Sequence, residues 1–262
     1  MQIFRFSIIA FLSLLLFSQK ATSQMRSYQE LGVFTGPLLF FSDYGERGNF
    51  QNDSNNNGFG IGVSHYVNFA YIGYRDNSIV TFLREHIKLK SEFSYSKSDL
   101  RHYGKYVENA ATSKPAFLLS QMRNETQIIS LGIGGEFSIR SIHNFEMTNH
   151  SLSPHISFGA QISYYDPHNY TLLGLIDNPD VVFPKYLKSI DNSSGFAGSV
   201  IGGIGCRYKI DVLSDFILDL KYQHYFSDWI EGVNPDPARF KENKANDGLM
   251  WLSFGYIRYF EF

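Results

Sequence analysis

The sequence predicts an all-β protein, specifically a transmembrane antiparallel up-and-down β-barrel of about eight strands with long external loops. The chain ends in residues 251–262 (WLSFGYIRYFEF), where the aromatic residues Phe254, Tyr256, Phe260 and Phe262 fall on one face at the period of two of a strand. Aromatic residues make up 16% of the chain, yet its mean hydropathy is only −0.18. This combination is typical of a barrel, because lipid-facing and lumen-facing residues alternate along each strand.

The amino-terminal segment predicts a secretory signal peptide over residues 1–23. Arg5 precedes an apolar stretch at residues 6–17, and small residues follow at 21–23. The alternative is a short membrane anchor, but the stretch is shorter than the roughly 20 residues that a spanning helix needs. We therefore expect residues 24–262 to form the barrel domain in the outer membrane of a Gram-negative cell, with both ends of the chain in the periplasm.

The net charge and the cysteine content limit the expected partners and the covalent cross-links of the chain. Removal of Arg5 and Lys20 with the signal peptide changes the formal net charge from −2 to −4, and the chain contains no run of basic residues. Nucleic acid is therefore not an expected partner. Cys206 is the only cysteine, so no intramolecular disulfide can form and the strand ladder must hold the fold.

Eight segments alternate apolar residues with small, polar or charged ones. The first four segments are residues 31–41, 59–69, 87–95 and 129–139. The first contains Pro37, which a closed ladder tolerates only at a bulge or a strand end. The third shows the clearest alternation, since Leu89 and Phe93 are interleaved with Lys88, Lys90 and Glu92. The fourth alternates isoleucine and leucine with serine and glycine.

The last four segments are residues 156–164, 196–208, 216–226 and 251–262. Small residues such as glycine and serine dominate the inward positions of the first two, and Asp219 and Lys221 occupy inward positions of the third. In the fourth, Arg258 interrupts the apolar face. A lipid-facing arginine costs about 0 to 1 kcal/mol near an interface but about 2 to 4 at mid-bilayer. Arg258 is therefore expected either near the headgroups or at a bulge that shifts the register.

Seven charged residues fall at inward positions, and we interpret them as a lumenal salt-bridge network. They are Lys88, Lys90, Glu92, Glu136, Arg207, Asp219 and Lys221. An eight-stranded barrel has an interior just wide enough for side chains to fill, whereas a porin needs about twice as many strands. The alternative is that these charges line a substrate-binding or conducting path.

The connections predict where function resides. Residues 42–57, 98–124, 166–194 and 227–248 are long and polar. With both termini in the periplasm, these four loops lie on the cell exterior, where small barrels usually contact partners. Within the first loop, residues 52–57 (NDSNNN) are expected to form a flexible tip and not a calcium site, since the acidic spacing of an ion-binding loop is absent.

No motif indicates an enzyme, a cofactor or a metal. The eight histidines occur outside any nucleophile-elbow pattern, and we expect them in loops or at the membrane interface. A metal site built from Asp99, His102, Asp166 and His168 is conceivable, but the spacing matches no ligand signature.

Several stretches resemble an uncharacterised family of outer-membrane barrels from flavobacteria and related Bacteroidota. These stretches are residues 42–50 (SDYGERGNF), 58–71 (GFGIGVSHYVNFAY), 164–170 (YYDPHNY), 226–235 (FSDWIEGVNP) and 242–247 (ENKAND). More distantly, residues 30–37 (ELGVFTGP) and the chain length are similar to the PorG-type barrel of the type IX secretion system. The resemblance implies a role in secretion or surface assembly but assigns no catalytic residue.

The leading functional hypothesis is a non-enzymatic barrel with a structural or partner-docking role, such as that of an accessory of secretion or surface assembly. Its expected partners are outer-membrane lipid, the barrel-assembly machinery that recognises the terminal aromatic strand, and envelope or secretion proteins. The alternatives are a narrow pore or small-solute-binding barrel and, third, a lipid-modifying enzyme that uses a serine and a histidine near the membrane edge.

Overall fold

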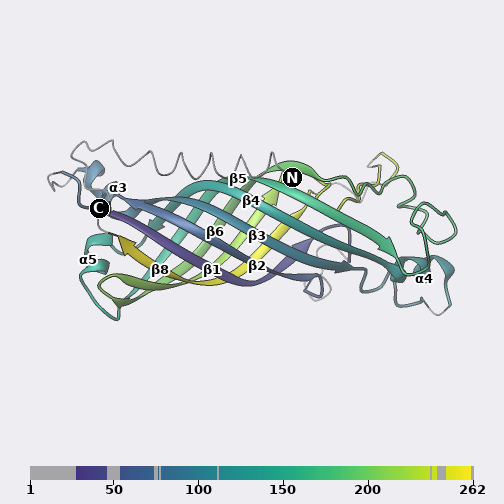
Figure 1. Cartoon of the computed structure of the whole chain (residues 1–262), viewed down its shortest axis with the longest axis horizontal. Helices are drawn as coiled ribbons and strands as arrows, with labels where there is room; N and C mark the ends of the chain where they lie inside the picture. Colours follow the sequence, from purple (N-terminus) through teal and green to yellow (C-terminus); the bar gives the residue numbers. More distant parts are fainter. Residues whose placement is uncertain are drawn as a thin grey trace, which may run out of the picture.

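The computed structural model shows one closed antiparallel barrel of eight strands, which confirms the predicted fold class (Figure 1). It describes residues 28–45, 54–73, 76, 78–110, 112–236, 238–240 and 246–260. The expected signal peptide and Phe262 lie outside the described residues. The strands are β1 (Tyr28–Phe41), β2 (Asn57–Asn68), β3 (Ile87–Arg101), β4 (Met122–Ser138), β5 (Leu152–Thr171), β6 (Gly195–Asp211), β7 (Ser214–Tyr225) and β8 (Gly248–Phe260).

Each strand pairs with its neighbours in sequence, and β1 pairs with β8 to close the barrel. Each predicted segment overlaps one of these strands, with ends that differ by one or more residues, and several strands are longer than predicted. The clearest case is β5, which has 20 residues, although a strand crosses a bilayer with about 9 to 11. Its outward residues Asp166 and His168 are exposed. A strand that continues into water no longer needs apolar outward residues, so the sequence alternation ends before the strand does.

The exterior of the barrel is apolar and faces lipid. Outward side chains remain largely exposed, including Ile133 (72%), Ile162 (64%) and Phe254 (59%). Tyr256 and Phe260 of the predicted terminal strand lie on the same outer face. Because a belt of such residues around a closed ladder is stable only in hydrocarbon, the barrel is a membrane protein.

The sequence predicted possible irregularities of the strand ladder at Pro37 and at Arg258, and only the first disturbs the pairing. Pro37 lies within β1 on the outer face, and the β1–β8 ladder omits Gly36 and Pro37 without any change of register. A Cβ atom at Gly36 would lie 2.1 Å from the carbonyl oxygen of Leu252, so the two strands approach closely at this point. Arg258 is exposed on the outer face opposite Ser214, with no register shift in the β7–β8 pair. The bulge predicted as one explanation of Arg258 is therefore absent.

The two ends of the barrel differ. One end holds the start of β1 and the end of β8, the short helices α3 (Ile79–His86) and α5 (Ile142–Glu146), and the tight β6–β7 turn (Figure 1). We call it the short-connection end. The four long connections and helix α4 (Lys114–Gln121) form the opposite, long-loop end (Figure 1).

Helix α3 leaves its apolar residues exposed beside the barrel wall. Ser78 caps its first turn, and Arg84 Nη1 donates to the carbonyl of Ile72 at 2.9 Å. Ile79 is 77% exposed, and the ring of Phe82 lies 6.3 Å from that of Phe137 on β4. The helix thus extends the apolar exterior at the short-connection end.

None of the helices in the described part of the chain is long and apolar enough to cross a bilayer.

Candidate functional site

The lumen near the short-connection end is filled by a network centred on Arg207 of β6. Its guanidinium contacts Glu30 Oε2 at 2.6 Å through Nη1 and Glu136 Oε1 at 2.7 Å through Nε. The same group lies 4.4 Å from the centre of the Tyr66 ring. Lys88 Nζ completes the arrangement at 2.5 Å from Glu30 Oε1. Strands β1, β3, β4 and β6 are therefore joined by charges that are almost completely buried, and β2 adds the Tyr66 ring.

A second layer of charges lies next to the first, further from the short-connection end. Glu92 accepts from Lys221 Nζ at 2.9 and 3.0 Å and lies 2.7 Å from Lys90 Nζ. The Lys221 ammonium also lies 4.2 Å from the centre of the Phe34 ring and 4.9 Å from that of Trp251. A hollow of about 30 Å³ adjoins these residues, which is room for roughly one or two water molecules.

All seven charges assigned to the lumen by alternation are buried in it, but the network includes partners that the alternation did not identify. His155, expected in a loop or at an interface, lies in the lumen with its Nε2 at 2.7 Å from Asp219 Oδ1. That expectation is wrong for His155 because β5 begins at Leu152, four residues before the predicted segment. Glu30, Lys209 and Asp215 also belong to the network. Each lies at or beyond the edge of a predicted segment, where few residues remain to define a period.

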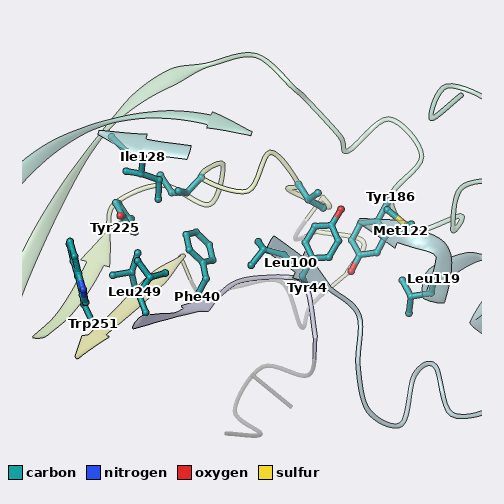
Figure 2. Close-up of a cluster of buried hydrophobic side chains, with 14 of the residues drawn as sticks. Phe40, Tyr44, Leu100, Leu119, Met122, Ile128, Tyr186, Tyr225, Leu249 and Trp251 are labelled. Carbon is teal, nitrogen blue, oxygen red and sulfur yellow. The ribbon is translucent and has the colours of Figure 1, made fainter. Parts of the chain in front are cut away.

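An apolar cluster closes the lumen at the long-loop end (Figure 2). In Figure 2 it extends from Trp251 and Leu249 on β8, past Phe40, to Tyr44 and Tyr186 in the loops. All of these side chains have at most 5% of their surface exposed. Inward apolar residues such as Leu249 break the polar-inside alternation, so the sequence did not predict this cluster.

Buried asparagines tie the long loops to the strands below them. Asn124 Nδ2 and Asn169 Nδ2 donate to the carbonyl of Glu231 at 2.7 and 2.8 Å. Tyr44 Oη donates to Asn169 Oδ1 at 2.7 Å. Asn192 Oδ1 accepts from the backbone N–H of Asn169 at 2.8 Å. Three loops and two strands therefore meet at one hydrogen-bonded centre, which fixes the conformation of the loops.

Asn56 corrects the prediction of a flexible tip at residues 52–57. It is fully buried, and its side chain donates to the carbonyl of Tyr44 at 2.7 Å and accepts from the backbone N–H of Arg101 at 2.8 Å. Residues 52 and 53 lie outside the described part of the chain. The composition of this segment could not reveal this role, because it does not distinguish an asparagine that is buried from one that is exposed to solvent.

A pair of buried carboxyl groups lies beneath the fourth long loop. Glu231 and Asp247 are both fully buried, and Glu231 Oε1 accepts from the backbone N–H of Asp43 at 2.9 Å. Burial, the charge of Asp247 and a hydrogen bond with Asp247 hold the pKa of Glu231 well above its usual value. Two carboxyl groups can share a hydrogen bond only when one is protonated, and the raised pKa of Glu231 means that it retains its proton to a higher pH than a solvated glutamate does.

A cavity of about 790 Å³ opens among the first three long loops. We call it the long-loop cavity. Its lining residues are Ser42, Asp43, Gly45, His102, Lys105, Tyr106, Asn109, Ser113, Pro115, Ala116, Leu119, Phe183, Lys185 and Tyr186. This volume is within the range of small-molecule sites, about 300 to 1,000 Å³.

His102 forms part of the cavity wall and is almost fully buried. Its ring stacks on Tyr44 at 4.5 Å and on Tyr186 at 5.6 Å between ring centres. Its Nδ1 accepts from the backbone N–H of Gly45 at 3.4 Å. Burial, with the positive charges of Lys185 and Arg123, lowers the pKa of His102 to about 3, so the ring is neutral. The proton therefore resides on Nε2, which has no hydrogen-bond partner in the described part of the chain.

The residues considered for a metal site are not brought together. His102 faces the long-loop cavity, whereas Asp166 and His168 are exposed on the outer face of β5. Among the described residues, no group of three or more His, Cys, Asp or Glu side chains is arranged to hold a metal ion.

The comparisons with known proteins find small outer-membrane barrels and assign no role. No family model and no curated protein matches the chain. Ail of Yersinia pestis is 10% identical with a TM-score of 0.42, over 90% of this chain and 100% of that one. A major outer-membrane protein of Thermus thermophilus is 11% identical with a TM-score of 0.48, over 89% and 99% of the two chains.

The outer-membrane enzyme PagL is also similar, with 10% identity and a TM-score of 0.33 over 87% of this chain and 98% of that one. These values are too low to transfer a substrate or partner. By its closed eight-stranded ladder and its lipid-facing exterior, the chain is an outer-membrane β-barrel.

Proposed function

We propose that the protein is a non-conducting, non-enzymatic outer-membrane barrel whose long-loop end docks a partner from the cell envelope or cell surface. One observation supports this most strongly. Two layers of paired charges and an apolar cluster fill the lumen along its length in the described residues. Because the interior is filled, the long-loop end is the surface that remains for recognition. The hydrogen bonds of Asn124, Asn169 and Asn192 hold these loops in a defined conformation. A preformed surface binds with a smaller ordering cost than a mobile one.

The partner class that fits this proposal is a secretion or surface-assembly protein of the envelope. Leu175 supports an apolar contact at this end, since its side chain is 82% exposed at the tip of the third long loop. Met147, at the short-connection end, is a matched control with 74% exposure.

Two measurements test the proposal. Purified protein in planar bilayers should give no unitary conductance steps, and it should not turn over phospholipid. A photo-crosslinking amino acid at Leu175, in intact cells, should give a discrete crosslinked protein that is absent when the same amino acid replaces Met147. Defined conductance steps would contradict the non-conducting barrel. Identical crosslinks from both positions would contradict docking at the long loops.

A further inference from the structure

The outer wall of β3, β4 and β5 continues beyond the apolar belt at the long-loop end. On β3 the last outward aromatic residue is Tyr95, and the outward residues that follow it are Lys97, Asp99 and Arg101. Outward aromatic residues mark the membrane interfaces of a barrel. With a rise of about 3.4 Å per residue and a strand tilt of about 35 to 45°, Arg101 lies about 15 Å beyond Tyr95 along the barrel axis. This part of the wall therefore stands outside the hydrocarbon and faces sideways over the membrane surface.

Two arginines occupy one row of this wall. Arg101 of β3 is directly opposite Arg123 of β4, and Arg123 is in turn opposite Tyr170 of β5. We call these three residues the arginine row. Neighbouring strands lie about 4.8 Å apart, so the row is about 10 Å wide. Like charges directly opposite each other destabilise an antiparallel pair, and an anion bound between the two arginines would remove this repulsion.

The side chains of the arginine row have donors available to a ligand. Nη1 of Arg123 donates to the carbonyls of Ser120 and Met122, both at 2.7 Å. These bonds fix the guanidinium and leave its Nε and Nη2 without a partner among the described residues. Arg101 is exposed, and its side chain has no hydrogen bond or ion pair in the same part of the chain. Tyr170 has 41% of its surface exposed.

The carboxylates of the neighbouring row do not neutralise the arginines. That row places Asp99 opposite Glu125. Glu125 is paired with Lys97 at 2.7 Å, on the side away from the arginine row. Asp99 makes no ion pair with Arg101 or Arg123 in the described part of the chain. Because Lys97 neutralises Glu125, the two arginines outnumber the remaining carboxylate of these two rows, and the end of the wall attracts an anion.

We propose that the arginine row binds a phosphate group carried by the saccharide of a membrane glycolipid. Arginine binds two phosphate oxygens through parallel N–H···O bonds, and such charge-assisted bonds are roughly twice as strong as neutral ones. Arg101 and Arg123 supply these donors, and Tyr170 supplies a hydroxyl group and an exposed ring on which a sugar can pack. The inference goes beyond the proposed function, because it requires no protein partner.

The height of the arginine row selects a glycolipid over an ordinary phospholipid. The polar layer of a bilayer is about 5 to 8 Å thick on each side. A phospholipid headgroup therefore ends below a row that lies about 15 Å beyond Tyr95. The saccharide of a glycolipid extends further from the hydrocarbon and reaches the row. A site that faces sideways also fits a ligand that is anchored in the same leaflet.

Three lipids separate the contributions of phosphate and sugar. The full barrel in a non-ionic detergent is titrated with rough lipopolysaccharide, with the same lipopolysaccharide after phosphatase treatment, and with phosphatidylglycerol. The second probe keeps the sugars and acyl chains but lacks accessible phosphates, and the third has a phosphate without a saccharide. Lipopolysaccharide should bind the wild-type barrel more tightly than either of the other two lipids by about tenfold or more.

Variants of Arg101 locate the site. Arg101→Gln should weaken binding of lipopolysaccharide by about fivefold or more. Arg101→Lys should also weaken it, by about threefold, because lysine keeps the charge but cannot form two parallel bonds. Arg258→Gln is the matched control, since Arg258 is an exposed arginine of the outer wall at the short-connection end, and it should leave binding unchanged. Heat-dependent gel migration verifies that each variant is folded before it is titrated.

Several results would overturn the inference. Equal binding of phosphatase-treated lipopolysaccharide would remove the role of the phosphate, and equal binding of phosphatidylglycerol would remove that of the saccharide. Wild-type affinity in Arg101→Gln, or an equal loss in Arg258→Gln, would place the lipid elsewhere on the wall. Absence of lipopolysaccharide binding while the Leu175 crosslink persists rejects this inference alone. Binding that depends on Arg101, without a Leu175 crosslink, rejects the proposed function alone.

Discussion

Glu92 shows how burial determines the contribution of an ion pair to the free energy of unfolding. It lies between Lys90 and Lys221 with 7% of its side chain exposed. Glu125 makes a contact of the same length, 2.7 Å, with Lys97 on the barrel exterior, where 36% of its side chain is exposed. Loss of one partner leaves the other charge buried in the first case but solvated in the second.

Glu92→Gln should therefore lower the free energy of unfolding in detergent by about 3 to 5 kcal/mol. Glu125→Gln, the matched control, should lower it by at most about 1 kcal/mol. Heat-dependent gel migration and a denaturant titration measure both. Equal effects would show that the lumen around Glu92 is as hydrated as the exterior.

Glu231 makes stability depend on pH in a direction opposite to that of most carboxylates. Its native pKa lies above the usual value of 4.5, so its contribution is complete below about pH 4.5 and is lost as the pH rises toward the native pKa. Glu231→Gln keeps an acceptor for the N–H of Asp43 and removes the proton that must be retained. The variant should gain about 1 kcal/mol or more over wild type at pH 8 relative to pH 4.5.

Unfolding temperatures of the variant and wild type at the two pH values measure this gain. Asp191→Asn in the third long loop is the control, because a hydrogen bond from Ser193 lowers the pKa of the exposed Asp191 carboxyl. That variant should show no gain at pH 8. The absence of any gain at pH 8 relative to pH 4.5 would mean that burial and Asp247 do not raise the pKa of Glu231 in the native protein.

At the scale of single elements, α3 has the arrangement of an interfacial helix. Ile79, Phe82 and Leu83 share one face and are exposed, whereas Thr81 lies on the opposite side of the helix. In a membrane the apolar face is expected to enter the headgroup and acyl boundary at the short-connection end.

Because Cys206 is the only cysteine, a Cys206→Ser background permits single labelling sites. In nanodiscs, an environment-sensitive dye on a cysteine at Ile79 should emit at shorter wavelength than the same dye free in buffer. The same dye at Thr81 should have water-like emission. Similar emission at the two positions would place α3 away from the bilayer.

The strands were predictable because outward residues within the bilayer face lipid, and this produces a period of two. That signal put Lys88, Lys90 and Glu92 on the inner face of β3, where the structure buries them. It could not find Asn169 or Glu231, because their positions depend on contacts between loops that are distant in sequence. The quoted stretches SDYGERGNF, YYDPHNY, FSDWIEGVNP and ENKAND nevertheless each supply a residue to the centre at the long-loop end, namely Tyr44, Asn169, Glu231 and Asp247.

At the scale of the whole molecule, the orientation of the barrel in the cell is a prediction. A protease site inserted near Asn178, in the third long loop, should be cut on intact cells. The same site near Asn144, in α5, should be protected until the outer membrane is permeabilised. Both positions are exposed in the structure, so accessibility within the protein does not bias the comparison. The reverse pattern would place the long loops in the periplasm.

The pairing of β1 with β8 has a consequence for how the chain assembles. Seven ladders join strands that are consecutive in sequence, and each can form as a local hairpin. The eighth must bring Gly36 against Leu252, which lie near the two ends of the barrel sequence. The free-energy cost of loop closure rises only as about (3/2)RT ln n with chain length n. Long-range pairing nevertheless slows folding, so this last step is costly chiefly in time rather than in free energy. Until the seam forms, β1 and β8 expose unpaired edges. A side chain at position 36 would hold the barrel open at the step when it is most prone to aggregation.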